Sequence, residues 1–152
     1  MIALVPGVPA LLPAYASLQD PVAELRAACL SAVARLGPRV RVVASGPSGL
    51  RVGAALVAAA SAEVVGEGET GVLVVGNGSA KRTEKAPGHL DPRAEAFDAG
   101  LRASFADIDL ALAEELWADA ACLGGLPPLA EADVRYDDAP FGVQYWVAVW
   151  SR

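Results

Sequence analysis

Histidine and cysteine are scarce in this chain, and their scarcity limits the metal chemistry that it can support. The sequence has one histidine, His89, so a metal centre built from several histidines is excluded. Its two cysteines, Cys29 and Cys122, have neither the spacing of a zinc motif nor that of a redox motif. Two cysteines so far apart in the sequence are expected to be buried as small apolar residues in a reducing compartment.

Positive charge is also scarce: 12 Lys and Arg stand against 18 Asp and Glu, the net charge is −6 and the pI is near 4.7. This balance argues against a nucleic-acid partner. The one basic cluster, Lys81, Arg82 and Lys85, fits either a solvated loop or an anion-binding loop. No apolar run has the length of a membrane span, and the opening run reaches Pro6 without a preceding basic residue, unlike a signal peptide. We therefore expect a cytoplasmic protein with no nucleic-acid or membrane partner.

Apolar residues, in contrast, are abundant: they make up 54 % of the chain, and the mean hydropathy is +0.38. A chain of 152 residues has the commonest size of one domain. Short β-branched runs alternate with amphipathic segments, as in α/β folds, and Asp20 with Pro21 is a typical helix start. The sequence therefore predicts one domain over residues 1–152, a three-layer α/β/α arrangement with a mainly parallel central sheet. The expected strands lie near 2–5, 39–44, 71–75, 133–136 and 143–150, the expected helices near 20–36, 92–104 and 109–121, and the alanine-rich residues 50–62 favour a further helix.

Three loops follow expected strands and are the places where a ligand would bind. Ligands of open α/β sheets lie beyond the carboxyl ends of the strands. Residues 6–13, 45–49 and 76–90 should therefore gather at one edge of the sheet. The turn after Tyr136, which carries Asp137 and Asp138, is a further candidate for that edge.

Several residues of these loops could carry chemistry, and each also has a structural explanation. Residues 76–82 are glycine-rich and contain Lys81, but they lack the spacing of a phosphate loop. His89 fits a solvated loop residue or a catalytic one. A triad of Ser79, His89 and Asp138 can be written, although no nucleophile-elbow sequence supports it. Asp137 and Asp138 could cooperate as acid and base or could cap a turn.

Three segments together, residues 77–88, 90–98 and 136–143, carry a family resemblance. Their sequences are NGSAKRTEKAPG, LDPRAEAFD and YDDAPFGV. The chain resembles the class III extradiol dioxygenase (LigB-like) superfamily, in particular its short actinobacterial members. The resemblance implies a shortened LigB-like fold. Members of that superfamily cleave catechol-type rings with Fe(II) held by two histidines and one carboxylate, and a further histidine acts as acid–base catalyst.

The resemblance also implies which residues occupy the family's metal pocket in this chain. Gly7 stands where the family has its first histidine ligand, Ala80 where it has the catalytic histidine, and Asn77 where it has an aspartate. The region of the second histidine ligand, between residues 45 and 71, is shortened and contains no histidine. The carboxylate position alone is retained, as Asp138, where the family more often has glutamate. One carboxylate does not hold iron at useful affinity, so we expect no bound metal or other cofactor.

These observations predict a non-catalytic relative that keeps a cleft for a small molecule or a protein partner, lined by Gly7, Asn77, Ala80, Asp137 and Asp138. A metal-free enzyme that uses Asp138 with Asp137, Ser79 and Lys81, and with His89, is the alternative. A true Fe(II)-dependent ring-cleaving dioxygenase is a third interpretation and would need a partner chain to complete the site. The expected strand at 143–150 is apolar on both faces and carries two tryptophans, which predicts a homodimer unless helices cover both faces.

Overall fold

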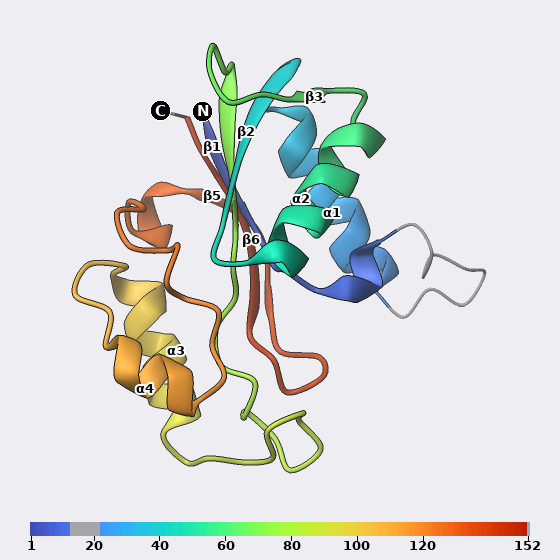
Figure 1. Cartoon of the computed structure of the whole chain (residues 1–152). Helices are drawn as coiled ribbons and strands as arrows, with labels where there is room; N and C mark the ends of the chain where they lie inside the picture. The colour runs from blue at the N-terminus through green and yellow to red at the C-terminus, as the bar shows by residue number, and fades with distance from the viewer. Residues whose placement is uncertain (13–21, 152) are drawn as a thin grey trace.

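Six strands form one mixed sheet that runs through the centre of the molecule in the order β3-β2-β4-β1-β6-β5 (Figure 1). A computed structural model describes residues 1–12 and 22–151 of the chain. Its strands are β1 (Ile2–Val5), β2 (Arg39–Ala44), β3 (Glu63–Val64), β4 (Gly71–Val75), β5 (Asp133–Asp138) and β6 (Tyr145–Trp150). Its helices are α1 (Ala23–Ala34), α2 (Pro47–Ala59), α3 (Ala94–Ala103) and α4 (Leu110–Glu115), with short 3-10 helices η1 (Pro9–Leu11) and η3 (Leu129–Glu131). The expected single α/β domain is confirmed.

The sheet is parallel on one side and antiparallel on the other. β1 pairs with β4, β4 with β2, and β2 with β3, all in parallel. β6 then pairs antiparallel with both β1 and β5, because the turn after Asp138 joins β5 and β6 as a hairpin. Strand β6 is therefore the one described strand that runs against the others.

Helices α1 and α2 lie together on one face of the sheet (Figure 1). Helix α1 presents a stripe at helical spacing, Leu25, Cys29 and Val33, which is buried against that face. Helix α2 approaches the sheet closely at Gly53, where a Cβ atom would lie 2.6 Å from Val42 Cγ1. A larger residue at Gly53 would push the helix off the sheet, so this glycine is needed for the packing.

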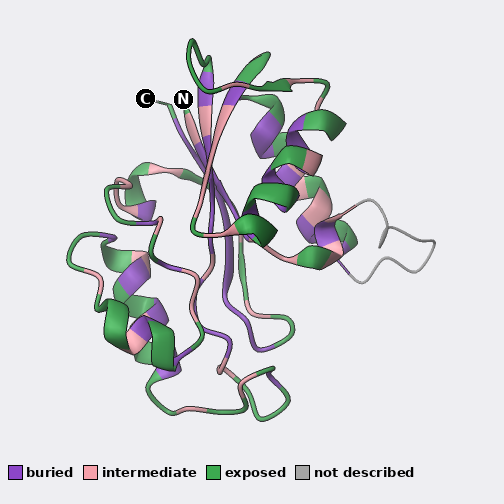
Figure 2. Ribbon diagram, in the orientation of Figure 1, coloured by how far each residue is buried: buried purple, intermediate pink, exposed green. Residues whose placement is uncertain are grey.

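The opposite face is covered by shorter elements, α3, α4, η3 and the irregular chain between them (Figure 1). Trp146 and Trp150 of β6 are buried there, and Phe105 meets both rings edge-on at centroid distances of 6.3 and 6.5 Å. Figure 2 shows that the middle of the sheet is buried on both sides. Every residue of β6 is buried by its own chain, as in the alternative in which helices cover both faces, so β6 itself gives no support to the predicted homodimer.

Most expected elements are present, with several corrections of their limits. The helix expected at 109–121 ends at Glu115, because Trp117 has a φ of +59° that no α-helix continues through. The favoured helix at 50–62 exists, but Pro47 begins it, so the expected loop 45–49 is shorter. The last strands are Asp133–Asp138 and Tyr145–Trp150, so Asp137 and Asp138 belong to a strand rather than a turn.

The first helix and β3 also differ from the expected elements. The described part of the first helix is Ala23–Ala34, and the start expected at Asp20 and Pro21 lies outside the described residues. The two-residue strand β3 was not predicted, because two exposed residues are too few to form a recognisable pattern. Within residues 1–12 and 22–151, none of the helices combines the length and the apolar character that crossing a membrane requires.

Candidate functional site

The loops after β1 and β4 meet at the carboxyl edge of the parallel strands, as the sequence predicted. The Gly7 amide donates a hydrogen bond of 3.3 Å to Asn77 Oδ1. Asn77 also exchanges two backbone hydrogen bonds of 3.0 Å with Asp119, whose carboxylate accepts a hydrogen bond from the Ser45 hydroxyl. β1 and β4 are neighbours, and the helices that follow them lie on opposite faces of the sheet (Figure 1). Such a switch point is where open α/β sheets bind ligands.

The chain after β4 does not leave the sheet at this edge but continues beside β6. β1 ends at Val5, and residues 78–82 take the vacant place next to the start of β6. The Gly78 amide donates to the Gln144 carbonyl and the Gln144 amide donates to the Ser79 carbonyl, both at 2.9 Å. A Cβ atom on Gly78 would lie 2.6 Å from Asp98 Oδ1, so only glycine fits at this crossing.

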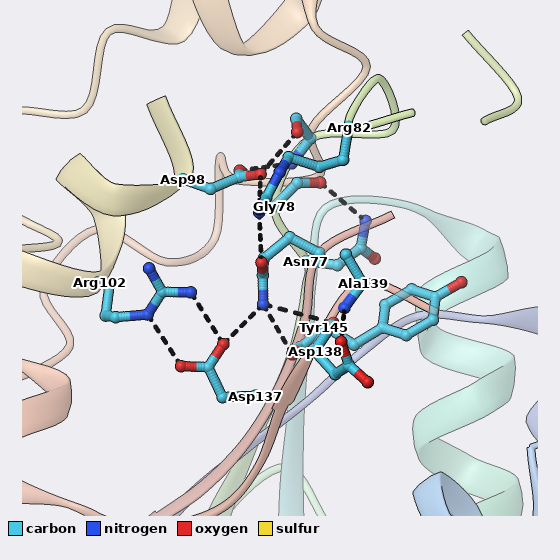
Figure 3. Close-up of polar contacts among 11 residues, drawn as sticks. Asn77, Gly78, Arg82, Asp98, Arg102, Asp137, Asp138, Ala139 and Tyr145 are labelled. Carbon is cyan, nitrogen blue, oxygen red and sulfur yellow. Dashed lines mark hydrogen bonds and ion pairs between the residues drawn. The ribbon is translucent and has the colours of Figure 1, made fainter. Parts of the chain in front are cut away.

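This crossing places a buried carboxylate, Asp98 of α3, beneath the loop (Figure 3). Asp98 is 0 % exposed and accepts hydrogen bonds from the Ser79 amide at 2.8 Å and from the Ser79 hydroxyl at 2.7 Å. Arg82 Nη1 lies 3.4 Å from the same carboxylate. Burial raises the pKa of Asp98, and the Ser79 and Arg82 contacts partly oppose that rise. The carboxylate therefore ties the loop after β4 to α3.

The polar contacts continue from Arg82 across β6 to the surface on the α3 side (Figure 3). Arg82 Nη1 donates to Gln144 Oε1 at 2.7 Å, and Gln144 Nε2 donates to Asp137 Oδ1 at 2.8 Å. Arg102 then binds both oxygens of Asp137 at 2.8 Å, and its guanidinium holds the pKa of Asp137 below the ordinary value. We call the connected residues the Asp98 network: Ser79, Asp98, Arg82, Gln144, Asp137 and Arg102.

Asp98, Gln144 and Arg102 were not predicted from the sequence as parts of a polar site. A signal for Asp98 was nonetheless present. Asp98 lies on the apolar side of its helix, four residues after Ala94 and three before Leu101, both of which are buried. An acid on the apolar stripe of a helix must find donors inside the protein, because burying an unpaired charge costs several kcal/mol.

Asp138 lies on the opposite face of the sheet from Asp137, because successive side chains of a strand alternate. One Asp138 oxygen accepts a hydrogen bond of 2.8 Å from the Ala139 amide. A cavity of about 310 Å³ opens beside it, between the start of α1 and the end of β5, and its lining includes Leu25, Tyr136 and Pro140. Burial, and then the charge of Asp138, raises the pKa of Tyr136. The adjacent carboxylates therefore have different partners and do not form an acid–base pair.

The other residues considered as catalytic have separate surroundings. The Ser79 hydroxyl is buried against Asp98, as described above. Lys81 lies over the ring of Trp117, with Nζ 5.3 Å from the ring centroid. His89 is exposed at a φ of +59°, and its Nδ1 is 3.3 Å from the Glu84 carbonyl oxygen. No hydrogen bond or ion pair of the described residues links Ser79, His89 and Asp138.

The side chains at the positions that the resemblance assigns to a metal pocket do not fit an Fe(II) centre. Gly7 has no side chain, and Ala80 is buried in the apolar core with a methyl group that cannot ligate. Asp138 supplies one carboxylate, and no group of three or more His, Cys, Asp or Glu side chains within residues 1–12 and 22–151 is arranged to hold a metal ion. Comparisons of the chain with protein-family models, curated proteins and solved structures give no match.

Proposed function

We propose that this chain is a non-catalytic relative of the class III extradiol dioxygenases, with a shortened three-layer LigB-like fold, and that it binds a small molecule beside Asp138. The observation that carries the proposal is that the residues at the would-be metal-pocket positions have structural roles. The Gly7 amide is bonded to Asn77, Ala80 packs in the apolar core, and Asp138 caps the Ala139 amide. Gly7 offers no ligand side chain, Ala80 offers no acid–base group, and Asp138 alone keeps a carboxylate, so iron chemistry has no support from these residues.

The layers of the proposed fold are supported by the distribution of the helices. Helices α1 and α2 pack on one face of the sheet, and α3, α4 and η3 accompany the second core on the other. The short region between β2 and β4 holds only α2 and the two-residue β3. This region is where the resemblance implies a missing block.

Binding is supported by the cavity beside Asp138. Its volume of about 310 Å³ is at the lower end of the range for small-molecule sites, roughly 300–1,000 Å³. Its apolar lining residues include Val22, Leu25 and Pro140, and its polar lining residues are Tyr136, Asp138 and Glu24. A few polar groups on apolar walls orient a ligand, and these particular groups favour one that donates hydrogen bonds.

The metal-free enzyme considered from the sequence has less support. Its residues lie in separate places: Ser79 is buried against Asp98, Lys81 lies over Trp117, and Asp138 faces the cavity on the α1 side. General acid–base catalysis needs its groups within hydrogen-bond reach of one substrate atom. The separate surroundings of these three side chains do not provide that arrangement.

The proposal is tested by metal analysis and by ligand titration of the purified chain. After incubation with Fe(II), Mn(II) or Zn(II) and desalting, we expect far less than one metal ion per chain and no oxygen uptake with catechol. Titration with small amines and phenols, followed by amide NMR, should shift the resonances of Val22, Leu25 and Tyr136. Asp138→Ala should weaken this binding, and Glu114→Ala, which removes an exposed carboxylate on α4, should not. Stoichiometric metal that is lost in Asp138→Ala would overturn the non-catalytic assignment.

A further inference from the structure

Strand β5 forms one end of the sheet and leaves an open edge. It pairs with β6 on one side, and no other strand in the described part of the chain pairs with it. Five of its six residues are exposed. Such an edge presents free N–H and C=O groups that another strand can bind.

The charges along this edge balance locally, although the whole chain carries a net charge of −6. Arg35 and Arg135 both contact Asp133, at 3.2 and 3.1 Å, and Arg102 pairs with Asp137. Asp138 forms no ion pair with any described residue. Positive charge is therefore in excess at the Arg135 end of the strand, and negative charge is in excess at the Asp138 end. The charges that balance are those of β5 and its ion-pair partners, three guanidinium groups and three carboxylates: Arg35, Arg102, Arg135, Asp133, Asp137 and Asp138. Glu24, which lines the cavity beside Asp138, adds to the negative charge at that end.

We propose that β5 pairs antiparallel with β5 of a second copy of this chain, about a two-fold axis near Tyr136 and Asp137. Antiparallel pairing brings the Arg135 end of one strand to the Asp138 end of the other. The symmetry repeats the contact, so each copy supplies one arginine and one aspartate. Asp138 thereby gains a cation that the described residues of its own chain do not provide, and the two sheets become continuous.

The surface on both faces of the edge suits a second strand. On the α3 side, a groove of about 340 Å³ is lined by Leu129, Ala130 and Val134, and Val134 is 41 % exposed. On the α1 side lies the cavity beside Asp138. An added strand directs alternate side chains to the two faces, so side chains of the second copy would border both hollows.

A β-bulge limits where the pairing can occur. The register of β5 with β6 shifts between Val134 and Tyr136, so the regular part of the edge is residues 136–138. Bulges and charged residues at sheet edges commonly prevent association. The bulge and the charges therefore oppose the pairing, and on their own they predict a strictly monomeric chain.

The experiment is a charge exchange measured by sedimentation equilibrium over a wide concentration range. The wild-type chain should show a reversible transition from its 15.5 kDa monomer to twice that mass. Arg135→Asp and Asp138→Arg should each weaken dimerisation about tenfold or more, because symmetry counts every like-charge contact twice. The double variant Arg135→Asp/Asp138→Arg should restore the dimer. Glu114→Arg, a reversal of an exposed carboxylate on α4, is the matched control and should dimerise normally.

Each remaining outcome counts against the proposal. A 15.5 kDa monomer at every concentration would exclude the interface. A dimer that both single variants leave intact, or that the double variant fails to restore, would place the contact elsewhere. Circular dichroism of every variant separates loss of association from loss of folding. Concentration-dependent protection of the β5 amides from hydrogen exchange gives a second readout that needs no substitution.

Discussion

Removal of the Asp98 carboxylate tests whether the buried network holds the loop after β4 on the rest of the domain. In Asp98→Ala the Ser79 amide and hydroxyl lose their acceptor, and Arg82 loses its buried partner. Asp98→Asn is the matched control, because it keeps the side-chain volume and an acceptor for the Ser79 amide.

The cost follows from the donors left without a partner. Each buried donor without an acceptor costs about 1–3 kcal/mol, and Ser79 contributes two of them. Removal of a buried charge offsets part of that cost, since burial raises the pKa of Asp98 and therefore disfavours its ionised form. We expect Asp98→Ala to lower the free energy of unfolding by about 3 kcal/mol and Asp98→Asn by about 1 kcal/mol.

Urea unfolding followed by tryptophan fluorescence measures both values, because Trp146 and Trp150 are buried in the second core. A loss below about 1 kcal/mol in Asp98→Ala would refute the reasoning, because unpaired buried donors cannot be that cheap. The pH dependence gives a further check. A carboxyl whose folded pKa is raised contributes stability that is present below the ordinary aspartate pKa of about 4 and is lost as the pH rises through the folded pKa. The wild type should therefore lose stability relative to Asp98→Asn over that pH range.

Three further predictions concern a turn, an ion pair and a thiol. Gly142→Ala should lower the free energy of unfolding by about 2–4 kcal/mol, because φ is +76° and a Cβ would lie 2.4 Å from the nearest side-chain atom. Gly124 has open space around it, so Gly124→Ala should change the free energy of unfolding little in thermal melts. Arg102→Gln should raise the pKa of Asp137 toward its ordinary value in carboxyl NMR titrations. The variant should also lose part of the stability that the ion pair contributes, which is present above the ordinary pKa of the carboxyl and is lost as the pH falls through the lowered folded pKa. An unchanged titration would contradict the pairing. Burial raises the pKa of Cys29 to about 12, so its thiol should resist alkylation at pH 8 until urea unfolds the chain, and rapid labelling of the native protein would contradict the packing of α1.

Local patterns in the sequence were sufficient for most of the fold. The runs at 39–44 and 71–75 match β2 and β4 because each contains three valines, and β-branched residues favour strands over other structures. The apolar pattern at 109–121 predicted a helix that is too long, because Leu116 and Ala120 are spaced as on a helix and both are buried. The chain instead turns at Trp117 and delivers them to the core as irregular structure, while Asp119 pairs with Asn77. Apolar spacing reports burial but not the backbone that achieves it.

The candidate site was likewise predictable only in part. The meeting of Gly7 and Asn77 was predictable, because both residues follow parallel strands and the ends of parallel strands share one edge. The partners of Asp98 were not, because Ser79 reaches it only after the chain crosses from β4 to the start of β6. That crossing is possible because β1 ends at Val5. The residues around Ser79 contain no pattern that indicates where β1 ends.

The sequence by itself determined which donor atoms the chain can offer. A chain with one histidine cannot build a centre of several histidines in any fold, because folding moves side chains and does not change them. Only the tertiary structure decided which side chains meet. Asp137 and Asp138 are adjacent in sequence, yet the strand directs one to Arg102 and the other to the cavity beside α1. The pairing of β5 with β6 sets those directions, and strand pairing joins residues by geometry rather than by order along the chain.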